Sequence, residues 1–488
     1  MYNPFDELPG EILEKILSFL PRGKETRFRD LRLVSRRLDH IVSAEIFHKI
    51  SFSAFRSLTV DAKRGIAEME SICKHVNILR LSTGVPADRV KIDPGPWLKL
   101  VELFIPKLAN LTCLEWWHVL VDCDYGPRGV QRTIELFGSL PNLRELTLRL
   151  CAYPPVELVQ SKPDEDFEFP LDPICNLQKL ALTWDLERRP PPILLQQISA
   201  LIARSPDLED FRFIIPFAFH RHENYGPQVK LGEIFGGTSS MVTPLRLRSL
   251  ETRAVVVDGG DFRRHLQHFH HLDRLRIRHD PSSSAARNIG EVFETLSSEH
   301  IYLRNVHIDA INDARVFDYL SSFSGIQELS LKPGDPLDDS PALIERFFQK
   351  VLPTQSASLK FLRLGGNIRT QWSRSIRMED LSRITDCQYL GHIFCWVWVT
   401  HDEVQSTDST VLDRWLETAM QLRNLKRFSC PPVTLKETQF ESQFDFGEWL
   451  PGQAAHDSEV QHFVEKVVFE FKWKWQAKAP FRIDSRRR

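Results

Sequence analysis

The chain has 488 residues, too many for one small hydrophobic core, so its length predicts two or more domains or one elongated repeat array. Its 63 basic and 65 acidic residues nearly cancel, which excludes a general attraction to nucleic acid or to a membrane surface. With 42% hydrophobic residues and no apolar stretch long enough to span a bilayer, the composition is typical of a soluble globular protein.

The cysteines and the N-terminal residues predict the compartment. None of the eight cysteines forms a C-x-x-C pair, and the N-terminus lacks a basic segment followed by an apolar one. Both features favour reduced thiols, so we expect a cytoplasmic or nuclear protein, or one found in both compartments.

The first predicted helix runs from about Leu8 to Pro21. Pro9 has no backbone N–H and therefore suits a first helical position, and Glu11 complements the positive end of the helix dipole. Apolar residues recur every four positions and form a stripe wider than a coiled-coil seam needs. The stripe consists of Leu8, Ile12, Leu13, Ile16, Leu17 and Leu20.

Two further helical segments are expected before residue 50. The second places Phe28, Leu31, Val34, Leu38 and Ile41 on one face, and the third is a short run over residues 45–50. Three helices of this size bury a low fraction of their surface. We therefore expect them to depend on a partner, on the rest of the chain, or on both.

Residues 8–38 resemble the F-box, whose pattern is Leu-Pro-x-Glu, hydrophobic positions, and a later Leu-x-Leu-Val before basic residues. Ser35 and Leu38 differ from the Cys and Trp of many members. The resemblance implies docking on the small Skp-type adaptor of a cullin-RING ubiquitin ligase. By this resemblance the docking residues are Leu8, Pro9, Ile12, Leu13, Ile16, Leu17, Leu31, Leu33, Val34 and Leu38. An alternative is that these helices only cap the following domain.

From residue 76 a short phrase recurs, with the form apolar-x-x-apolar-x-apolar, ahead of segments with helical periodicity. Clear copies begin at Leu143, Leu177, Leu208, Leu272, Leu303, Ile326 and Leu359, and weaker copies begin at Val76, Leu114, Leu250, Leu390, Leu425 and Val464. Helical faces follow around residues 194–202, 289–296, 343–351 and 412–419. Repeated strand and helix predict parallel strands with the helices on one side.

This pattern resembles the leucine-rich repeat family. The Asn or Cys that the family places eight positions after the first Leu is present as Cys151 and Asn367, while other copies lack it. The resemblance implies an α/β fold: a three-helix F-box followed by an irregular solenoid with parallel strands on the concave side and helices outside. The predicted division is an F-box at 1–50, a linker helix region at 51–75, the solenoid at 76–475 and a basic tail at 476–488.

Three segments interrupt or end the predicted array. Residues 154–172 and 219–245 are rich in turn-forming residues and are expected to leave the array as surface loops. Residues 467–475 alternate aromatic and charged side chains, which predicts a strand that either seals the end of the array or binds a partner. Trp396 and Trp398 allow the same two interpretations, core packing or partner binding.

The sequence offers no catalytic or metal-binding motif. Neither a phosphate-binding loop nor a dinucleotide fingerprint is present, and no Ser or Cys has a flanking motif that would activate it. A histidine cluster has neither H-E-x-x-H nor paired cysteines beside it. Its members are His265, His268, His270 and His271. We therefore expect no metal, no cofactor and no enzymatic activity.

One row of residues predicts recognition. In a leucine-rich repeat, the residue between the last two apolar positions of each phrase lies on the concave face. The row reads Arg80, His118, Thr147, Ala181, Arg212, Ala254, Arg276, His307, Ser330, Arg363, Phe394 and Ser429, with no acid. Since arginine pairs well with carboxylate and phosphate, the row predicts a surface for an acidic or phosphorylated protein segment. The alternative is a row of solvated arginines that only aids solubility.

The two resemblances together imply a substrate-recognition subunit of a cullin-RING ubiquitin ligase. It would bind the adaptor through the F-box and the substrate through Arg80, His118, Arg212, Arg276, His307 and Arg363. The other hypothesis is a leucine-rich-repeat scaffold for protein–protein interactions with no link to ubiquitination.

Overall fold

The structure is a computed structural model, which describes the chain in segments. The described residues are 9, 12–13, 15, 36–53, 72–82, 95–119, 126–151, 169–185, 189–215, 228–241, 243–278, 289–311, 313–333, 341–365, 378–395, 397–398, 411–429, 432–433 and 482–484. The chain divides into two compact units. Unit 1 is Met1–Pro216 with Glu233–Leu245, and unit 2 is Phe217–Gly232 with Arg246–Arg488.

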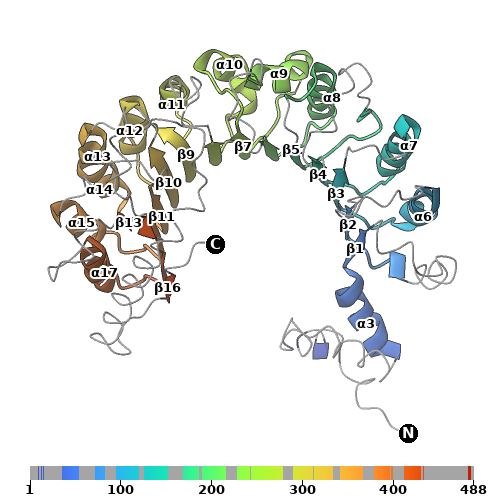
Figure 1. The fold of residues 1–488 in the computed structure, drawn as a ribbon, viewed down its shortest axis with the longest axis horizontal. Helices are drawn as coiled ribbons and strands as arrows, with labels where there is room; N and C mark the ends of the chain where they lie inside the picture. The colour runs from blue at the N-terminus through green and yellow to red at the C-terminus, as the bar shows by residue number, and fades with distance from the viewer. Residues whose placement is uncertain are drawn as a thin grey trace, which may run out of the picture. The chain divides into compact units, whose positions relative to one another are not determined.

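Unit 1 is built from parallel strands that follow one another in chain order. Its strands are β1 (Lys49–Ser53), β2 (Ile78–Ser82), β3 (Cys113–Val119), β4 (Glu145–Cys151), β5 (Lys179–Asp185) and β6 (Asp210–Ile214). Its α-helices are α3 (Arg36–Phe47), α6 (Gly95–Phe104), α7 (Gly126–Gly138) and α8 (Pro192–Ala203), with a 3₁₀-helix, η2 (Ile105–Lys107). Helices α6, α7 and α8 lie on one side of the strands (Figure 1).

Unit 2 repeats this plan, again with parallel pairing in chain order. Its main strands are β7 (Ser249–Arg253), β8 (Arg274–Arg278), β9 (Asn305–Ile311), β10 (Glu328–Pro333), β11 (Phe361–Leu364), β12 (His392–Cys395), β14 (Arg427–Ser429) and β16 (Arg482–Asp484). A second small sheet pairs β13 (Val397–Trp398) with β15 (Pro432–Val433).

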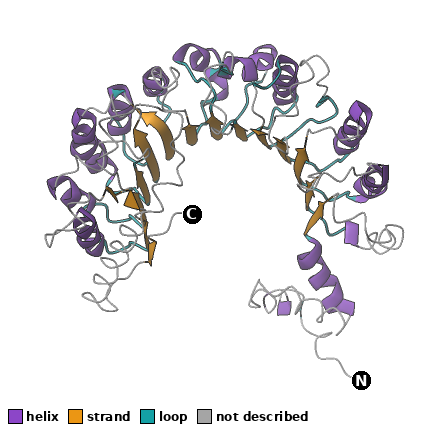
Figure 2. Ribbon diagram, in the orientation of Figure 1, coloured by secondary structure: helices purple, strands orange, loops and turns teal. Residues whose placement is uncertain are grey.

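The helices of unit 2 alternate with its strands and lie on one side of them (Figure 2). They are α10 (Gly259–Arg264), η6 (Leu266–His268), α11 (Ile289–Ser298), α12 (Ala314–Ser321), α13 (Pro341–Arg346), the π-helix η8 (Phe347–Val351), α14 (Leu352–Gln355), α15 (Met378–Ile384) and α17 (Val411–Gln421). Between β6 and β7 lie α9 (Leu231–Phe235) and η5 (Gly236–Ser240). Among the described residues, no helix has the length and apolar character needed to cross a membrane.

The recurring phrase explains why each strand forms and which way it faces. In β8, Leu275 and Ile277 are fully buried, while Arg274, Arg276 and Arg278 are exposed or partly exposed. This alternation directs every second side chain toward the helices. The first apolar residue of the phrase, Leu272, is also buried, just ahead of the strand. The sequence positions that repeat are therefore those that build the core.

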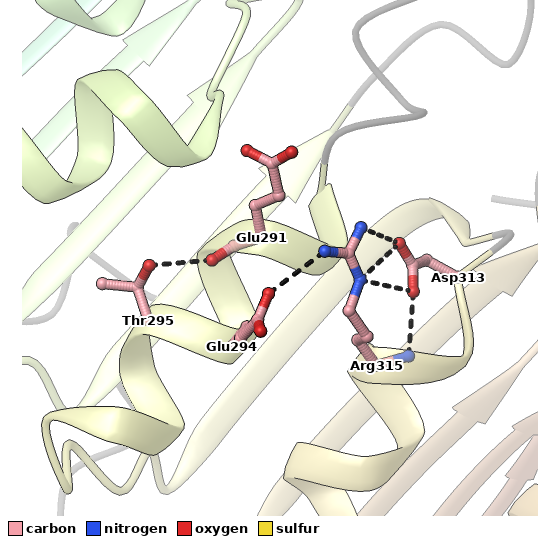
Figure 3. Close-up of polar contacts among 5 residues, drawn as sticks. All are labelled: Glu291, Glu294, Thr295, Asp313 and Arg315. Carbon is pink, nitrogen blue, oxygen red and sulfur yellow. Dashed lines mark hydrogen bonds and ion pairs between the residues drawn. The ribbon is translucent and has the colours of Figure 1, made fainter.

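Local sequence also fixes where the helices begin. Pro191 is the N-cap of α8 and Pro192 its first residue, as expected for a residue with a fixed φ and no N–H. In α12 the side chain of Asp313 caps the helix by accepting a hydrogen bond of 2.8 Å from the Arg315 backbone N–H. The Arg315 guanidinium also pairs with Asp313 and reaches Glu294 on α11, at 3.1 Å (Figure 3). These contacts tie neighbouring repeats together.

A ladder of side-chain amides connects successive repeats in front of the strands. Asn110, Asn142 and Asn424 each precede the first Leu of a phrase, and each donates a hydrogen bond to a backbone carbonyl one repeat earlier. The resemblance places its ladder eight positions after the first Leu, where only Cys151 and Asn367 match, so that ladder was expected to be mostly missing; Asn367 lies outside the described residues. The described ladder lies instead at the beginning of the strands.

Buried Gln355 joins two repeats of unit 2 in a similar way. Its amide oxygen accepts hydrogen bonds from the Gly325 and Ile326 N–H groups, at 3.1 and 3.0 Å, and its amide nitrogen donates to the Leu320 carbonyl. Gly325 has a φ of 126°, which favours glycine. A buried polar side chain with all these partners stabilises the turn it bridges.

The structure confirms the predicted strand and helix alternation. The seven clear phrases form β4, β5, β6, β8, β9, β10 and β11, and the weaker copies at Val76, Leu390 and Leu425 form β2, β12 and β14. The predicted helical faces lie in α8, α11, α13 with η8, and α17. The N-terminal three-helix arrangement lies largely outside the described residues, as do the predicted strand at 467–475 and Trp396. Trp398 lies in β13.

Three expectations about segments were wrong. Residues 45–50 do not form a separate helix, because α3 continues to Phe47 and β1 begins at Lys49, so the sheet begins well before residue 76. The expected loop at 219–245 contains α9 and η5, and Phe235 is buried against Phe211 with 5.4 Å between ring centroids. Part of the predicted tail forms β16, which pairs with β14.

Candidate binding surface

Each unit presents one sheet face opposite its helices, which we call the strand face of that unit. Paired strands align the residues of successive repeats in rows across this face. In unit 1 the central row reads Arg80, Glu115, Thr147, Ala181 and Arg212. In unit 2 it reads Glu251, Arg276, His307, Ser330, Arg363 and Phe394.

The predicted row was wrong at two strands. His118 is in register with Leu150 and not with Thr147, and Glu115 takes the predicted place. Similarly, Ala254 follows β7, and Glu251 occupies the row. Both errors come from starting the phrase one apolar position too late, at Leu114 and Leu250 instead of Leu111 and Leu247. Asn110 directly before Leu111, like Asn142 before Leu143, is a signal that marks the true start. The row therefore contains acids, contrary to expectation.

The strand face of unit 1 carries nearly equal numbers of basic and acidic side chains. The basic ones are Lys49, Arg80, Arg149, Lys179 and Arg212, and the acidic ones are Glu115, Glu145, Asp185 and Asp210. Most form ion pairs between adjacent strands. Arg80 pairs with Glu115, Arg149 with Asp185, and Lys179 with Glu145 at 2.6 Å, each on the adjacent strand. Lys49 on β1 also reaches Glu115, two strands away.

Trp117 is a large exposed aromatic side chain on the strand face of unit 1. Its side chain is 38% exposed and lies in register with Arg149. The guanidinium carbons of Arg80 and Arg149 lie 5.4 and 5.7 Å from its ring centroid. These are cation–π distances, so the ring is held between two arginines that are already paired with carboxylates.

The strand face of unit 2 is strongly basic among its described side chains. Its basic residues are Arg253, Arg274, Arg276, Arg278, Lys332, Arg363 and Arg427, and its acidic residues are Glu251, Asp309 and Glu328. Glu251 is buried and pairs with Arg276 at 3.3 Å. One of the few acids on this face is therefore already engaged.

Asp309 is also engaged, in a recessed group with His307 and Lys332. The His307 Nε2 lies 3.3 Å from one Asp309 oxygen, and the Lys332 amine lies 4.0 Å from the other. Burial lowers the pKa of His307, and Arg278 and Arg276 lower it further, against the opposing effect of Asp309. Burial opposes ionisation of Asp309, but His307, Lys332 and Arg278 outweigh it and hold its pKa below the usual value. At neutral pH this group is a neutral imidazole beside a carboxylate and an ammonium.

Two arginines on this face have no carboxylate partner among the described residues. The Arg278 Nε is buried without a hydrogen-bond partner. The Arg363 guanidinium lies over the Phe394 ring, 4.5 Å from its centroid, and forms no ion pair with the described part of the chain. Burial lowers the pKa of Arg363; the charge of Asp309 opposes this, and the charges of Arg278 and Arg276 lower the pKa further. These guanidinium groups therefore repel one another across the face.

A small hollow lies beside this group on the same face. It is lined by Arg274, Asn305, Glu328, Ser330 and Phe361. Arg276 and His307 also line it, so the hollow adjoins the central row.

Of the predicted substrate-binding residues, the structure brings Arg276, His307 and Arg363 together in unit 2. Arg80 and Arg212 lie at the strand face of unit 1, where Arg80 is paired with Glu115. Sequence reasoning missed Asp309 and Lys332, which lie one row further along their strands. The same alternation, continued by two positions along each strand, identifies Asp309 and Lys332, and also Arg278.

Of the predicted adaptor-binding residues, the structure describes Pro9, Ile12, Leu13 and the backbone of Leu38. The Ile12 and Leu13 N–H groups donate to the Pro9 carbonyl at 3.1 and 3.2 Å, so a helical turn begins at Pro9 as predicted. Ile12 is 43% exposed and Leu13 is buried. Leu38 lies in α3. Leu8, Ile16, Leu17, Leu31, Leu33 and Val34 lie outside the described residues.

The histidine cluster does not converge in the structure. His265 and His268 are buried behind β8, with ring centroids 6.4 Å apart, while His270 and His271 are exposed. Burial lowers the pKa of both buried histidines. Within the described residues, no group of three His, Cys, Asp or Glu side chains is placed to hold a metal ion.

No protein-family model matches the chain, and a search of curated proteins finds no relative. The geometry of the two strand faces and the N-terminal turn is therefore the basis for the function.

Proposed function

We propose that this protein is a substrate-recognition subunit of a cullin-RING ubiquitin ligase. The N-terminal helices would bind a Skp-type adaptor, and the strand faces would bind a protein substrate. The observation that carries the receptor role is the basic strand face of unit 2, where Arg278 and Arg363 have no carboxylate partner among the described residues. A charged row on a rigid repeat sheet is suited to binding a polypeptide of opposite charge.

The N-terminal turn supports the adaptor-binding role. The F-box resemblance places Ile12 and Leu13 on the docking helix, and the two side chains differ in exposure. Leu13 is buried within the chain, while Ile12 is 43% exposed. A helix that buries one apolar side and exposes another has surface left for a second protein.

The proposed mechanism is proximity. The subunit would hold its substrate near the charged ubiquitin-conjugating enzyme and so raise the effective concentration of the acceptor lysine. No side chain of this protein would take part in the chemistry, and no cofactor would be required.

A leucine-rich-repeat scaffold without an adaptor is the second candidate, and one observation favours it. Only His48 separates α3 from β1, and its carbonyl accepts hydrogen bonds from the Asn77 and Ile78 N–H groups, both at 3.0 Å. The end of α3 is thus joined directly to the first strands, as in a helical cap.

Replacement of Ile12 by Asp tests the adaptor role. We expect at least a tenfold loss of adaptor in a native co-purification, because a charge would be buried in an apolar interface. Ile193 on α8 is a matched control, since it is 45% exposed, and Ile193→Asp should keep the adaptor. Wild-type adaptor recovery with Ile12→Asp would contradict the proposal. Absence of adaptor from the wild-type preparation would favour the scaffold.

A triple variant tests the receptor role. Alanine at Arg212, Arg276 and Arg363 should abolish substrate capture and leave adaptor recovery unchanged. Unchanged capture of substrate by this variant would remove the strand faces from the proposal.

A further inference from the structure

Trp117 is an aromatic side chain that the fold of unit 1 directs outward. Strand alternation places Leu114 and Trp116 of β3 in the core, where the centroid of the Trp116 ring lies 5.2 Å from that of Phe137. Trp117 therefore points to the strand face, and it is 38% exposed. An exposed indole keeps a large apolar area in water, so covering that area with a partner is favourable.

Arginines on the neighbouring strands β2 and β4 hold the Trp117 ring in place. Arg80 and Arg149 lie 5.4 and 5.7 Å from its centroid. Each is itself fixed by a carboxylate, Glu115 for Arg80 and Asp185 for Arg149. A side chain that is ordered before binding loses less conformational entropy when a partner arrives. Tryptophan and arginine are also the residue types that contribute most of the binding energy in protein interfaces.

Short, uncharged side chains lie next to Trp117 across the sheet. They are Thr147 on β4 and Ala181 and Thr183 on β5, all partly exposed, and we call them the low strip. On the next strand, β6, Ile214 is in register with Thr183 and is also partly exposed. Neighbouring strands lie about 4.8 Å apart, so the backbones of β3 and β6 are roughly 14 Å apart. Two larger apolar side chains, Trp117 and Ile214, thus flank a strip of shorter ones.

The charges around the low strip already pair with one another. Arg149, the long side chain on β4, is turned toward the Trp117 ring and Asp185. Glu115 and Glu145 likewise pair with basic residues on adjacent strands. A charged side chain laid over the strip would therefore lose hydration and gain little from groups that are already neutralised. An apolar side chain would lose no such hydration and would bury apolar area on both flanks.

We infer that the strand face of unit 1 binds an aromatic or branched aliphatic side chain of a protein segment, which lies on the low strip between Trp117 and Ile214. The inference rests on the proposed function, in that the strand faces are taken to bind a polypeptide, and it applies equally to a scaffold without an adaptor. The ion pairs around the strip would form a polar rim that keeps water from the contact. Binding should depend little on salt, because the contact is apolar.

The test uses the full chain and fluorescent degenerate peptide libraries with a fixed central phenylalanine, leucine, alanine, aspartate or lysine. Fluorescence anisotropy measures their binding. We expect the phenylalanine and leucine libraries to bind at least tenfold more tightly than the alanine, aspartate and lysine libraries. This preference should be the same at low and at high salt, since screening acts on charges and not on apolar contacts.

Two variants disrupt the contact in different ways. Trp117→Ala removes one flank of the low strip, and Ala181→Gln fills the strip with a longer uncharged side chain. Each should weaken binding of the phenylalanine library about tenfold. Tyr302→Ala is the matched control, because Tyr302 is an aromatic residue of unit 2 that is 50% exposed, in the turn before β9. This variant should bind the library as the wild type does.

The outcomes separate this inference from the ligase proposal. Equal binding of all the libraries, no binding by any of them, or wild-type binding by either disrupting variant with unchanged circular dichroism would overturn the apolar contact. An equal loss of binding in Tyr302→Ala would also overturn it, because the contact would then lie outside unit 1. Adaptor co-purification is measured on the same variants and should not change. Selective binding of the phenylalanine library by a protein that recovers no adaptor would support the contact and overturn only the ligase role.

Discussion

The two units share a fold but differ on their strand faces. In unit 1, Arg80 and Arg149 each have a carboxylate on the next strand, and the exposed Trp117 lies between them. On the strand face of unit 2, the described basic side chains outnumber the acidic ones, and the acids Glu251 and Asp309 are already engaged. Backbone pairing and apolar spacing are the same in both. The difference lies only at the strand-face positions, whose side chains do not pack against the helices.

This difference shows where function is encoded in a repeat protein. The apolar positions must fill the space between sheet and helices, so they are occupied by large hydrophobic residues in both units. The alternate positions only have to be compatible with water and with their neighbours. Unit 1 uses them to pair its own charges, whereas on the described strand face of unit 2 the basic side chains outnumber the acidic ones. Predictions on the two units can therefore be made in matched pairs.

The largest expected effect is the loss of folding stability on truncation of a buried core leucine, and it should be equal in the two units. Leu180 in β5 and Leu329 in β10 occupy the same position of the phrase, and both are buried. Truncation of either to alanine should lower the free energy of unfolding by about 2–5 kcal/mol. Urea denaturation followed by circular dichroism measures it. A near-zero effect for one of them would break the equivalence of the two cores.

The next effect is the loss of stability when a paired glutamate on each strand face is neutralised. The Glu251 side chain is 7% exposed, and the Glu115 side chain is 19% exposed. Glu251→Gln should cost about 2–3 kcal/mol, because it leaves Arg276 partly buried without a partner. Glu115→Gln should cost about 1 kcal/mol or less, because Arg80 can turn to water. The same denaturation experiment applies. The reverse order would mean that burial does not control the strength of these pairs.

A smaller effect concerns pH. Burial lowers the pKa of His265, His268 and His307, all in unit 2, below the ordinary 6.5. Between their folded pKa values and 6.5 the unfolded chain binds more protons, so stability should fall as pH decreases through that window. The free energy of unfolding measured at pH 7.5, 6.5 and 5.5 should decrease with pH. The His268→Phe variant should show a smaller decrease. A stability that rises on acidification would contradict the assignment of buried neutral histidines.

The core of the fold could be predicted from the sequence because the apolar phrase is both periodic and physically required. Leu275 and Ile277 are identified by spacing alone, and both are buried. The register was missed at β3 and β7, because Leu114 and Leu250 were taken as first positions when they are second ones. The residue before the phrase, such as Asn110, carries a hydrogen bond that spacing of apolar residues does not reveal.

The candidate site was only partly predictable. A row position identifies Arg276, His307 and Arg363, but it does not say which arginine has a carboxylate beside it. That property depends on residues one strand away, such as Glu251, which lies twenty-five positions earlier in the chain. Segments such as 228–241 were misjudged because glycine and proline indicate turns without showing whether the neighbouring apolar residues pack into the array.

The smallest expected effect comes from the exposed ion pairs of unit 1. Lys179 lies 2.6 Å from Glu145, with 53% and 38% of the two side chains exposed. Side chains this exposed gain little from pairing, since water and salt screen the attraction, so Lys179→Met should change the free energy of unfolding by about 0.5 kcal/mol or less. Urea denaturation at low and at high salt checks this, and the small difference should vanish at high salt. A loss of more than roughly 1 kcal/mol would show that the charge balance of unit 1 serves its stability. In that case the contrast with unit 2 would be one of folding as well as of binding.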